Sequence, residues 1–367
     1  MKVIHHSIIY ENPLPQLRSR QSLFPWLCEM PDGSLLASHC IGEAFESIDG
    51  TSYLSKSFDG GKTFSKPKPM FERDERLPNS NDTCKVTYLH DGRLVALGYA
   101  YERSDPDLPI GNPETGGLLD DFLFVSYSSD QGDTWSPWQL IECSWGPHVE
   151  ASAPLTVLQN GSWVTPITGF PKWDGTRTGK NCGRLLRSDD NGETWSDDTI
   201  CMEFEGDEVT CYEQRLCQLE SGTVVCIGWN EDLRTGKLLN NHYTLSHDDG
   251  RTFSSPKDTG IGGQASSVCA IGGEKLLALH ALRKDTDRPG IYGYIVDLSS
   301  GSWDIEEELL IWKPQIPIIK NEKMAEVFSF LKFGQPGAIL LADKDILVSY
   351  WREEQGVYKT CAARIQL

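Results

Sequence analysis

A turn followed by a β-rich run recurs six times along this sequence of 367 residues, and it constrains the fold more than any other feature. Successive turns lie 51 to 71 residues apart. Each copy is typical of a tight hairpin that joins two strands. The copies read PDGSLLAS, HDGRLVAL, QNGSWVTP, ESGTVVCI, GGEKLLAL and ADKDILVSY, and their second turn residues are Gly33, Gly92, Gly161, Gly222, Gly273 and Lys344. The chain is therefore expected to contain six similar β units.

A second motif, Ser-x-Asp-x-Gly-x-Thr-aromatic, recurs four times out of phase with the hairpins. It begins at residues 57, 128, 188 and 246 and contains Asp59, Asp130, Asp190 and Asp248. An Asp carboxylate in such a turn accepts backbone N–H bonds, and the Gly allows a positive φ. The motif predicts a clamp for the turn between the outer strands of a unit, and not a catalytic group.

Helical periodicity is almost absent, since no segment sustains apolar residues at i, i+3, i+4 and i+7 over three turns with caps at both ends. Short strands in six units indicate an all-β, six-bladed β-propeller. We expect one domain over residues 1–367, with the last blade completed by residues near 4–10. A two-sheet sandwich is the alternative, but it gives no reason for a period of about 60 residues.

Composition excludes several function classes. The formal net charge of −19 disfavours nucleic-acid binding, because phosphate contacts need a basic surface. No stretch approaches the roughly 18 apolar residues of a membrane span, and the N-terminal stretch lacks the apolar run of a signal peptide. The sequence therefore predicts a cytoplasmic protein without a membrane partner.

The eleven cysteines are scattered singly, with no CxxC pair and no Cys/His spacing suited to zinc. Most of them fall in apolar, strand-like runs. They are expected to be buried free thiols, and no metal site is predicted.

Counting along the repeats locates a functional site. In a propeller the inner strand of each blade follows the central channel, so the residue nine positions before each hairpin turn lies at one channel mouth. Nine positions after the turn, the second strand returns to that mouth. The residues at these positions, with their immediate neighbours, are Phe24, Asp82, Thr83, Tyr101, Glu102, Arg103, His148, Glu150, Ser152, Phe170, Glu213, Trp229, Glu231, Gln264, Leu282, Arg283, Gln335, Trp351, Arg352 and Glu353.

This collection of carboxylates, arginines, amides and aromatic rings suits a sugar. Glu213 is the first catalytic candidate, as a nucleophile or as a base. Asp82 and Glu150 are alternatives for the acid, which needs a raised pKa. The remaining candidates bind substrate or hold the site: Arg103, Arg283 and Arg352 on substrate oxygens, Arg215 beside Glu213, and Tyr101, His148, Trp229, Gln264 and Gln335 around them.

The four Asp motifs, six units and hairpins resemble the sialidase superfamily over nearly the whole chain. The resemblance implies an Asp-box propeller, three arginines that hold a substrate carboxylate, a Tyr/Glu nucleophile pair and an Asp acid. Glu213, in CYEQRLCQLESG, matches the Glu of the pair. The resemblance places the acid on the loop before the first Asp-box, where this chain reads EAFESIDG and offers Glu46 and Asp49.

The chain departs from this pattern in three places. Leu23 precedes Phe24-Pro25 where an Arg-Ile-Pro stretch is expected, and Arg20 lies nearby but displaced. Trp229-Asn230 stands where a further arginine is expected, although Arg283 or Arg288 is available in the fifth unit. FGQPG, with Gln335, stands where the family has its Tyr.

We therefore expect a sialidase-like, exo-acting glycoside hydrolase that removes a terminal sugar from an oligosaccharide or glycoconjugate without a cofactor. A lyase acting on uronate sugars, with Tyr or His as base, is one alternative. A non-catalytic, carbohydrate-binding propeller is the other.

Overall fold

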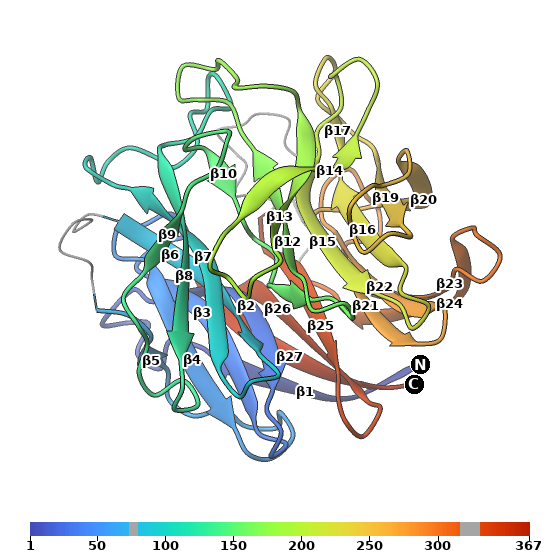
Figure 1. Ribbon diagram of the computed structural model, residues 1–367. Coiled ribbons are helices and arrows are strands. Elements are labelled where there is room, and N and C mark those ends of the chain that lie inside the picture. The colour runs from blue at the N-terminus through green and yellow to red at the C-terminus, as the bar shows by residue number, and fades with distance from the viewer. Residues whose placement is uncertain (73–79, 316–330) are drawn as a thin grey trace.

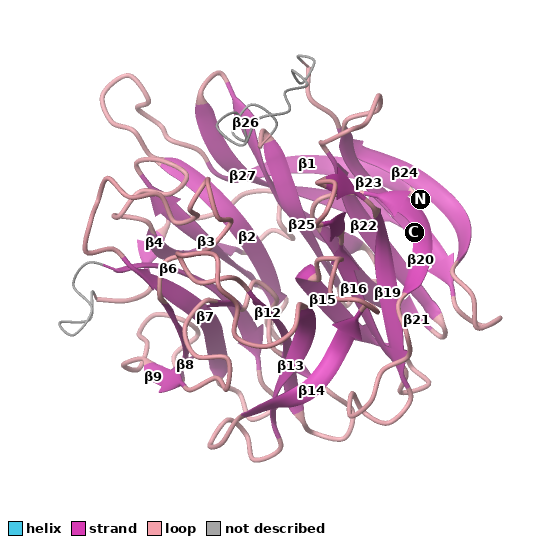
Figure 2. Cartoon of the chain, turned by 90° about the horizontal axis from the view of Figure 1, so that it is seen from above, coloured by secondary structure: helices cyan, strands magenta, loops and turns pink. Residues whose placement is uncertain are grey.

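Six antiparallel sheets, one for each repeat of the sequence, make up most of the computed structural model, which describes residues 1–72, 80–315 and 331–367. The sheets surround a central axis as the blades of a propeller (Figures 1 and 2). The described residues contain strands, turns and loops but no helix, and thus no helix that crosses a membrane. The predicted six-bladed, all-β propeller is confirmed.

Each blade begins with an inner strand beside the channel and continues outward strand by strand. Blade 1 contains β2 (Gln21–Glu29), β3 (Leu35–Gly42), β4 (Thr51–Ser57) and β5 (Lys68–Pro69). Blade 2 contains β6 (Ser80–Tyr88), β7 (Leu94–Glu102), β8 (Asp121–Ser128) and β9 (Gln139–Ile141). Blade 3 contains β10 (Val149–Glu150) and β11 (Thr156–Val157), which both pair with β12 (Trp163–Gly169), then β13 (Cys182–Ser188) and β14 (Ser196–Glu203).

Blade 4 contains β15 (Tyr212–Gln218), β16 (Val224–Trp229), β19 (Asn240–Ser246) and β20 (Lys257–Gly262). A small hairpin of β17 (Glu231–Asp232) and β18 (Lys237–Leu238) extends from it. Blade 5 contains β21 (Ser266–Gly272), β22 (Lys275–Leu282), β23 (Gly290–Asp297) and β24 (Asp304–Trp312). Blade 6 contains β25 (Phe333–Leu340), β26 (Ile346–Glu354), β27 (Val357–Gln366) and β1 (Lys2–Tyr10).

The two ends of the chain meet in blade 6. The N-terminal strand β1 pairs antiparallel with the C-terminal strand β27, with Lys2 opposite Gln366. Figure 1 shows both termini side by side. The prediction that an N-terminal strand completes the last blade is confirmed, and the pairing closes the ring.

Both repeated turns adopt the geometry that the sequence implies. All six hairpin residues have positive φ, including Lys344 at 73°, the copy without glycine. In the first Asp motif, Asp59 Oδ1 accepts the N–H groups of Lys62 and Thr63, at 3.0 and 2.9 Å. The same contact with the Thr N–H recurs at Asp130, Asp190 and Asp248. These motifs join the third and fourth strands of blades 1 to 4, as predicted.

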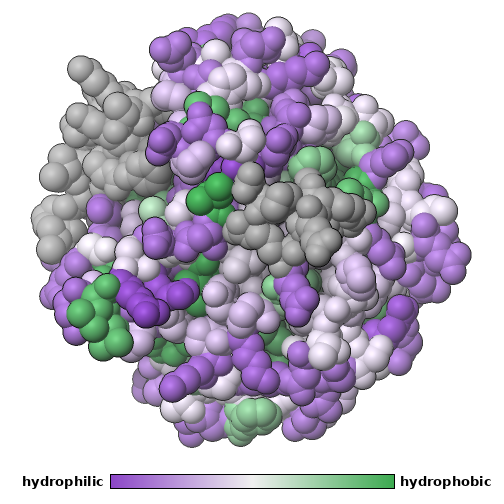
Figure 3. Space-filling view, turned by 90° about the vertical axis from the view of Figure 1, so that its left-hand side faces the viewer, coloured by the Kyte–Doolittle hydropathy of each residue, from purple (hydrophilic) through white to green (hydrophobic). Residues whose placement is uncertain are grey.

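The hydrophobic core is divided among the blade interfaces. Each of six clusters of buried residues joins neighbouring blades; one of them contains Leu97 of blade 2 and Ile167 of blade 3. Ten of the eleven cysteines are buried, and all eleven are free, as predicted. The outer surface is mostly hydrophilic on the face shown in Figure 3.

Candidate active site

Three inner strands are irregular at the same level of the channel. Phe24 in β2, Glu213 in β15 and Gln335 in β25 have φ values of 56°, 44° and 42°. The pairing of each strand with its neighbour shifts register at that residue. Such a bulge re-aims a side chain, and a positive φ in a residue other than glycine is a mark of a constrained site. All three side chains line one cavity.

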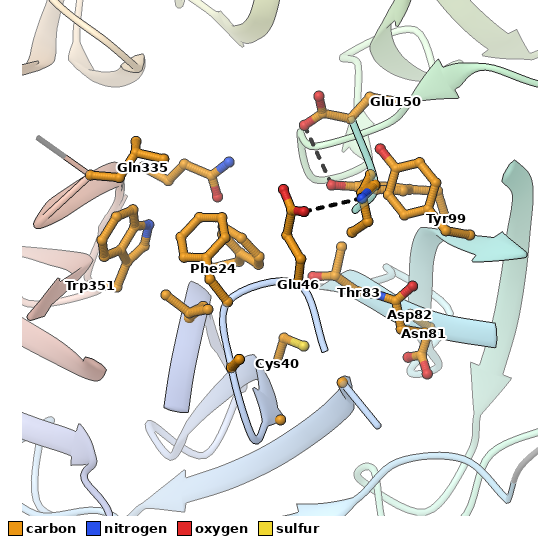
Figure 4. A pocket seen from close by; sticks show the side chains of 18 of the residues that line it. Phe24, Cys40, Glu46, Asn81, Asp82, Thr83, Tyr99, Glu150, Gln335 and Trp351 are labelled. Carbon is orange, nitrogen blue, oxygen red and sulfur yellow. Dashed lines mark hydrogen bonds between the residues drawn. The ribbon is translucent and has the colours of Figure 1, made fainter. Parts of the chain in front are cut away.

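The cavity has a volume of about 230 Å³ and receives side chains from all six blades, so it lies on the propeller axis. Figure 4 shows Glu46, Glu150, Tyr99, Phe24 and Gln335 around it. Its lining comprises Leu23, Phe24, Cys40, Gly42, Ala44, Phe45, Glu46, Gly50, Asn81, Asp82, Thr83, Tyr99, Tyr101, Ile110, Glu150, Glu213, Arg283, Leu331, Gln335 and Trp351.

Glu213 is held by hydrogen bonds to both carboxylate oxygens. Gln335 Nε2 donates to Oε1, and Trp229 Nε1 donates to Oε2 at 2.7 Å. These donors fix the orientation of the carboxylate. Three residues chosen from the sequence as site candidates are therefore in direct contact.

Glu150 lies on the short strand β10, which Asp121 holds in place. The Asp121 Oδ1 atom accepts the N–H groups of His148 and Val149, both at 3.0 Å. The Tyr99 hydroxyl donates to Glu150 Oε1 at 3.4 Å (Figure 4). Burial, and then the nearby negative charge of Glu213, raise the pKa of Glu150 to about 7. Glu150 is thus suited to exchange a proton near neutral pH.

Glu46 reaches the cavity from the loop between β3 and β4. Its Oε2 atom accepts the N–H of Ile110 at 3.1 Å, and burial raises its pKa above the usual value. Asp49, the other acid predicted on this loop, is exposed and accepts the N–H of Glu43 at 2.9 Å. Only Glu46 of the pair lines the cavity.

Asp82 lines the cavity but is bonded to the neighbouring blade. Its Oδ1 atom accepts the Ser52 N–H at 3.0 Å, and its Oδ2 atom accepts the Thr51 hydroxyl at 2.5 Å. These bonds connect blade 2 to blade 1. Of the two acids that the repeat count offered beside Glu213, Glu150 has the environment of a proton donor.

Among the described residues, Arg283 is the single cation that lines the cavity. Its Nη1 atom donates to the Phe333 carbonyl at 2.8 Å, and Nε lies 3.5 Å from Gln264 Oε1. The guanidinium passes over Gly334, where an added Cβ would lie 2.2 Å from Nη1. Burial lowers its pKa to about 10, and the guanidinium stays charged at neutral pH.

Two further cations are buried behind the wall. Arg215 donates to the Ser152 hydroxyl at 2.9 Å and to the carbonyls of Glu213 and Gln214. Lys85 donates to the Phe24 carbonyl at 2.5 Å, and burial lowers its pKa to about 7. Arg215 therefore supports the backbone that carries Glu213 and makes no side-chain ion pair with it.

Aromatic rings form one side of the cavity. Phe24 and Phe45 meet edge to face with centroids 5.4 Å apart, and Phe45 packs in the same way on Trp351 at 5.6 Å. This side comes from blades 1 and 6. The carboxyl groups Glu46, Glu150 and Asp82 lie on the other side in Figure 4.

Several predicted site residues lie outside the lining. His148 is buried and has its Nδ1 atom 3.4 Å from the Leu119 carbonyl, while Arg103 donates to the carbonyls of Glu46 and Leu108. Arg352 stacks over Trp312 at 5.5 Å. The residues that the structure does not bring to the cavity wall are Arg20, Asp49, Arg103, His148, Arg215, Trp229, Gln264 and Arg352.

Sequence reasoning missed Tyr99, Phe45, Asp121 and Lys85. Tyr99 had a local signal, because it lies two residues before Tyr101 on one strand and so shares its face. Both side chains line the cavity. Phe45 and Asp121 are placed by loops and neighbouring blades, for which the repeats give no signal.

No protein-family model matches the chain, and no curated protein matches it. Among solved structures, a protein of unknown function from Dyadobacter fermentans has a TM-score of 0.77 at 17% identity, covering 100% of this chain and 99% of that one. The Hadza microbial sialidase Hz136 has a TM-score of 0.66 at 16% identity, covering 95% of this chain and 66% of that one. A leech intramolecular trans-sialidase has a TM-score of 0.67 at 13% identity, covering 99% and 70%. The chain has the sialidase-like propeller fold.

At these identities the similarity establishes the fold alone. The chain spans about two thirds of the length of the two sialidase chains. Within this sialidase-like propeller, Gln335 stands where the resemblance implies a Tyr, and it binds Glu213. A Gln/Glu pair therefore occupies the position for which a Tyr/Glu pair was implied.

Proposed function

We propose that this protein is an exo-acting glycoside hydrolase in which Glu150 is the general acid and Glu213 is the opposing carboxylate. The observation that carries the proposal is that the two glutamates share one cavity in different environments. Burial and the charge of Glu213 raise the pKa of Glu150, whereas two N–H donors bind and orient the Glu213 carboxylate. Glycoside hydrolysis needs such a division of roles between two carboxyl groups.

The reaction follows from these two environments. Glu150 gives its proton to the glycosidic oxygen as the bond to the anomeric carbon breaks. Glu213 stabilises the positive charge on that carbon, either by attacking it directly or by taking a proton from an attacking water. Water supplies the hydroxyl of the released sugar. If Glu213 attacks directly, Glu150 regains its proton from the water that hydrolyses the glycosyl ester; if Glu213 acts as base, it releases its proton to solvent and Glu150 takes one up from solvent.

Gln335 and Tyr99 support this reaction without exchanging protons. An amide is not a nucleophile, so Gln335 positions Glu213 and does not replace the nucleophilic Tyr that the resemblance implies. Burial raises the pKa of Tyr99 well above its usual value, and the phenol therefore stays a neutral hydrogen-bond donor. The carboxylate Glu213 is left as the nucleophile or base.

The cavity also supports an exo-acting enzyme. Residues from all six blades line it, and its volume suits one sugar ring better than an extended chain. The similar solved structures include proteins named as sialidases. A uronate lyase has less support, because Arg283 is the single cation in the described cavity wall available to neutralise a uronate carboxylate.

Digestion of a glycan library by the purified protein, followed by mass spectrometry of the released sugars, tests the proposal. Release of an intact monosaccharide, lost in Glu150→Gln on substrates with poor leaving groups, is the expected result. An unsaturated sugar product would instead identify a lyase. No release from any glycan, by a protein that binds glycans, would identify a non-catalytic propeller.

A further inference from the structure

The charged groups of the cavity wall are mostly acidic. Four carboxyl groups, those of Glu46, Asp82, Glu150 and Glu213, line the cavity. Arg283 is the single cation in the lining of the described part of the chain. A site that binds an anion would have more cations than carboxyl groups in its wall.

Three more cations lie behind this wall. Lys85 is bonded to the Phe24 carbonyl, Arg215 to Ser152 and two carbonyls, and Arg103 to the carbonyls of Glu46 and Leu108. Together with Arg283 they match the four carboxyl groups in number. None of these three cations lines the cavity.

Arg283 is poorly placed to clamp a carboxylate. A bidentate contact uses two adjacent N–H groups, on the edge shared by Nη1 and Nη2 or on the edge shared by Nε and Nη2. Nη1 already donates to the Phe333 carbonyl, and Nε faces Gln264. Each edge thus includes an atom engaged with the protein, and Nη2 alone has no partner among the described residues.

We propose that the cavity selects an uncharged terminal sugar and rejects terminal sugars that carry a carboxylate, such as sialic and uronic acids. This inference rests on the proposed function for its choice of a sugar as ligand. A carboxylate entering the cavity would meet Arg283 through Nη2 alone, beside an excess of acidic groups, and a partly desolvated charge without a full partner is costly. A neutral ring adds no such cost.

The remaining polar groups of the wall suit hydroxyl groups. Burial raises the pKa of both Tyr99 and Tyr101 well above the usual value, so both phenols are neutral donors. Carboxylates accept hydrogen bonds from sugar hydroxyls, and the aromatic side formed by Phe24, Phe45 and Trp351 can pack against the C–H face of a ring. These groups recognise a neutral sugar without help from an arginine cluster.

The test is a glycan array probed with Glu150→Gln, which binds substrate without consuming it. The array carries matched glycans that end in galactose or galacturonate, in glucose or glucuronate, and in the same cores capped with sialic acid. The expected result is binding to at least one neutral terminus, at least about tenfold stronger than to its acidic counterpart. Equal or stronger binding to the acidic member, or binding to no terminus, would overturn the inference.

A second variant examines the electrostatic cause. Glu46→Gln removes one negative charge from the wall and keeps the side-chain shape, so the preference for the neutral member should shrink several-fold. Glu193→Gln, at an exposed turn between β13 and β14, is the control and should leave the preference unchanged. An unchanged preference in Glu46→Gln would contradict the electrostatic account.

The two proposals fail separately. Hydrolysis of sialylated glycans by the parent protein would remove the neutral-sugar inference and leave the hydrolase proposal standing. Binding to neutral glycans without release of any sugar would remove the hydrolase proposal and leave the neutral-sugar inference standing.

Discussion

Gln335 Nε2 in blade 6 donates a hydrogen bond to Glu213 Oε1 in blade 4, across the axis of the propeller. Both residues have positive φ, at 42° and 44°, and both lie at a break in the pairing of an inner strand. Two bulges therefore bring an amide and a carboxylate from distant parts of the sequence into contact.

Gln335→Leu removes this donor and leaves a side chain of similar size. A hydrogen bond to a charged group contributes about 1.5–3 kcal/mol, so turnover is expected to fall by about tenfold or more. Trp229→Phe removes the second donor to Glu213 and should also lower turnover. Steady-state kinetics on variants that melt like the parent check this, and parental turnover in both would contradict the positioning role.

The pKa of Glu150 governs the basic limb of the pH profile. The acid must carry a proton, so kcat/KM should be full below the pKa and decline as pH rises through about 7. Glu150→Gln should abolish this limb on substrates with good leaving groups, where some turnover remains. A pH profile of the parent that stays flat from pH 6 to 9 would exclude Glu150 as the acid.

Asp59→Ala and Asp248→Ala should lower Tm by roughly 1–3 °C and leave turnover per folded molecule unchanged. Hydrogen bonds from the turn lower the pKa of Asp59 to about 2. Partial burial raises the pKa of Asp248, but the hydrogen bonds from its turn outweigh this effect and lower the pKa to about 2. Since these folded-state pKa values are depressed, the stabilisation is present above the usual Asp pKa and is lost as pH falls through about 2. Thermal melts of parent and variants from pH 2 to 7 measure this; a Tm difference that stays constant over that range would argue against the ionised clamp.

Gly334→Ala tests the placement of Arg283. An added Cβ would lie 2.2 Å from Nη1, so the guanidinium must move away from the Phe333 carbonyl. Overpacking of this kind costs about 1–3 kcal/mol of stability. We expect a folded variant with a several-fold higher KM; an unchanged KM would show that Arg283 does not contact the substrate.

The fold was predictable because its signals are local. Each hairpin turn and each Asp motif specifies its own backbone geometry, and even Lys344 adopts the positive φ of the five glycines. The nine-residue count also found Phe24, Glu213 and Gln335, since the inner strands bulge at one level. The strands themselves are therefore well described by sequence pattern.

The site was only partly predictable because neighbouring residues on a strand face opposite ways. Trp351 lines the cavity, whereas Arg352 next to it stacks over Trp312. Arg103 binds the loop of Glu46, and Ile110 binds the Glu46 carboxylate. Contacts between long loops depend on the assembled blades and leave no pattern in the sequence.

The rate of sugar release by Glu213→Gln, on the glycan that the library identifies, tests the central claim most directly. The amide keeps the shape of Glu213 but cannot accept the proton or form a stable glycosyl ester. With fold and binding retained, kcat should drop by a factor of roughly 10² or more. A kcat close to that of the parent would remove Glu213 from the mechanism.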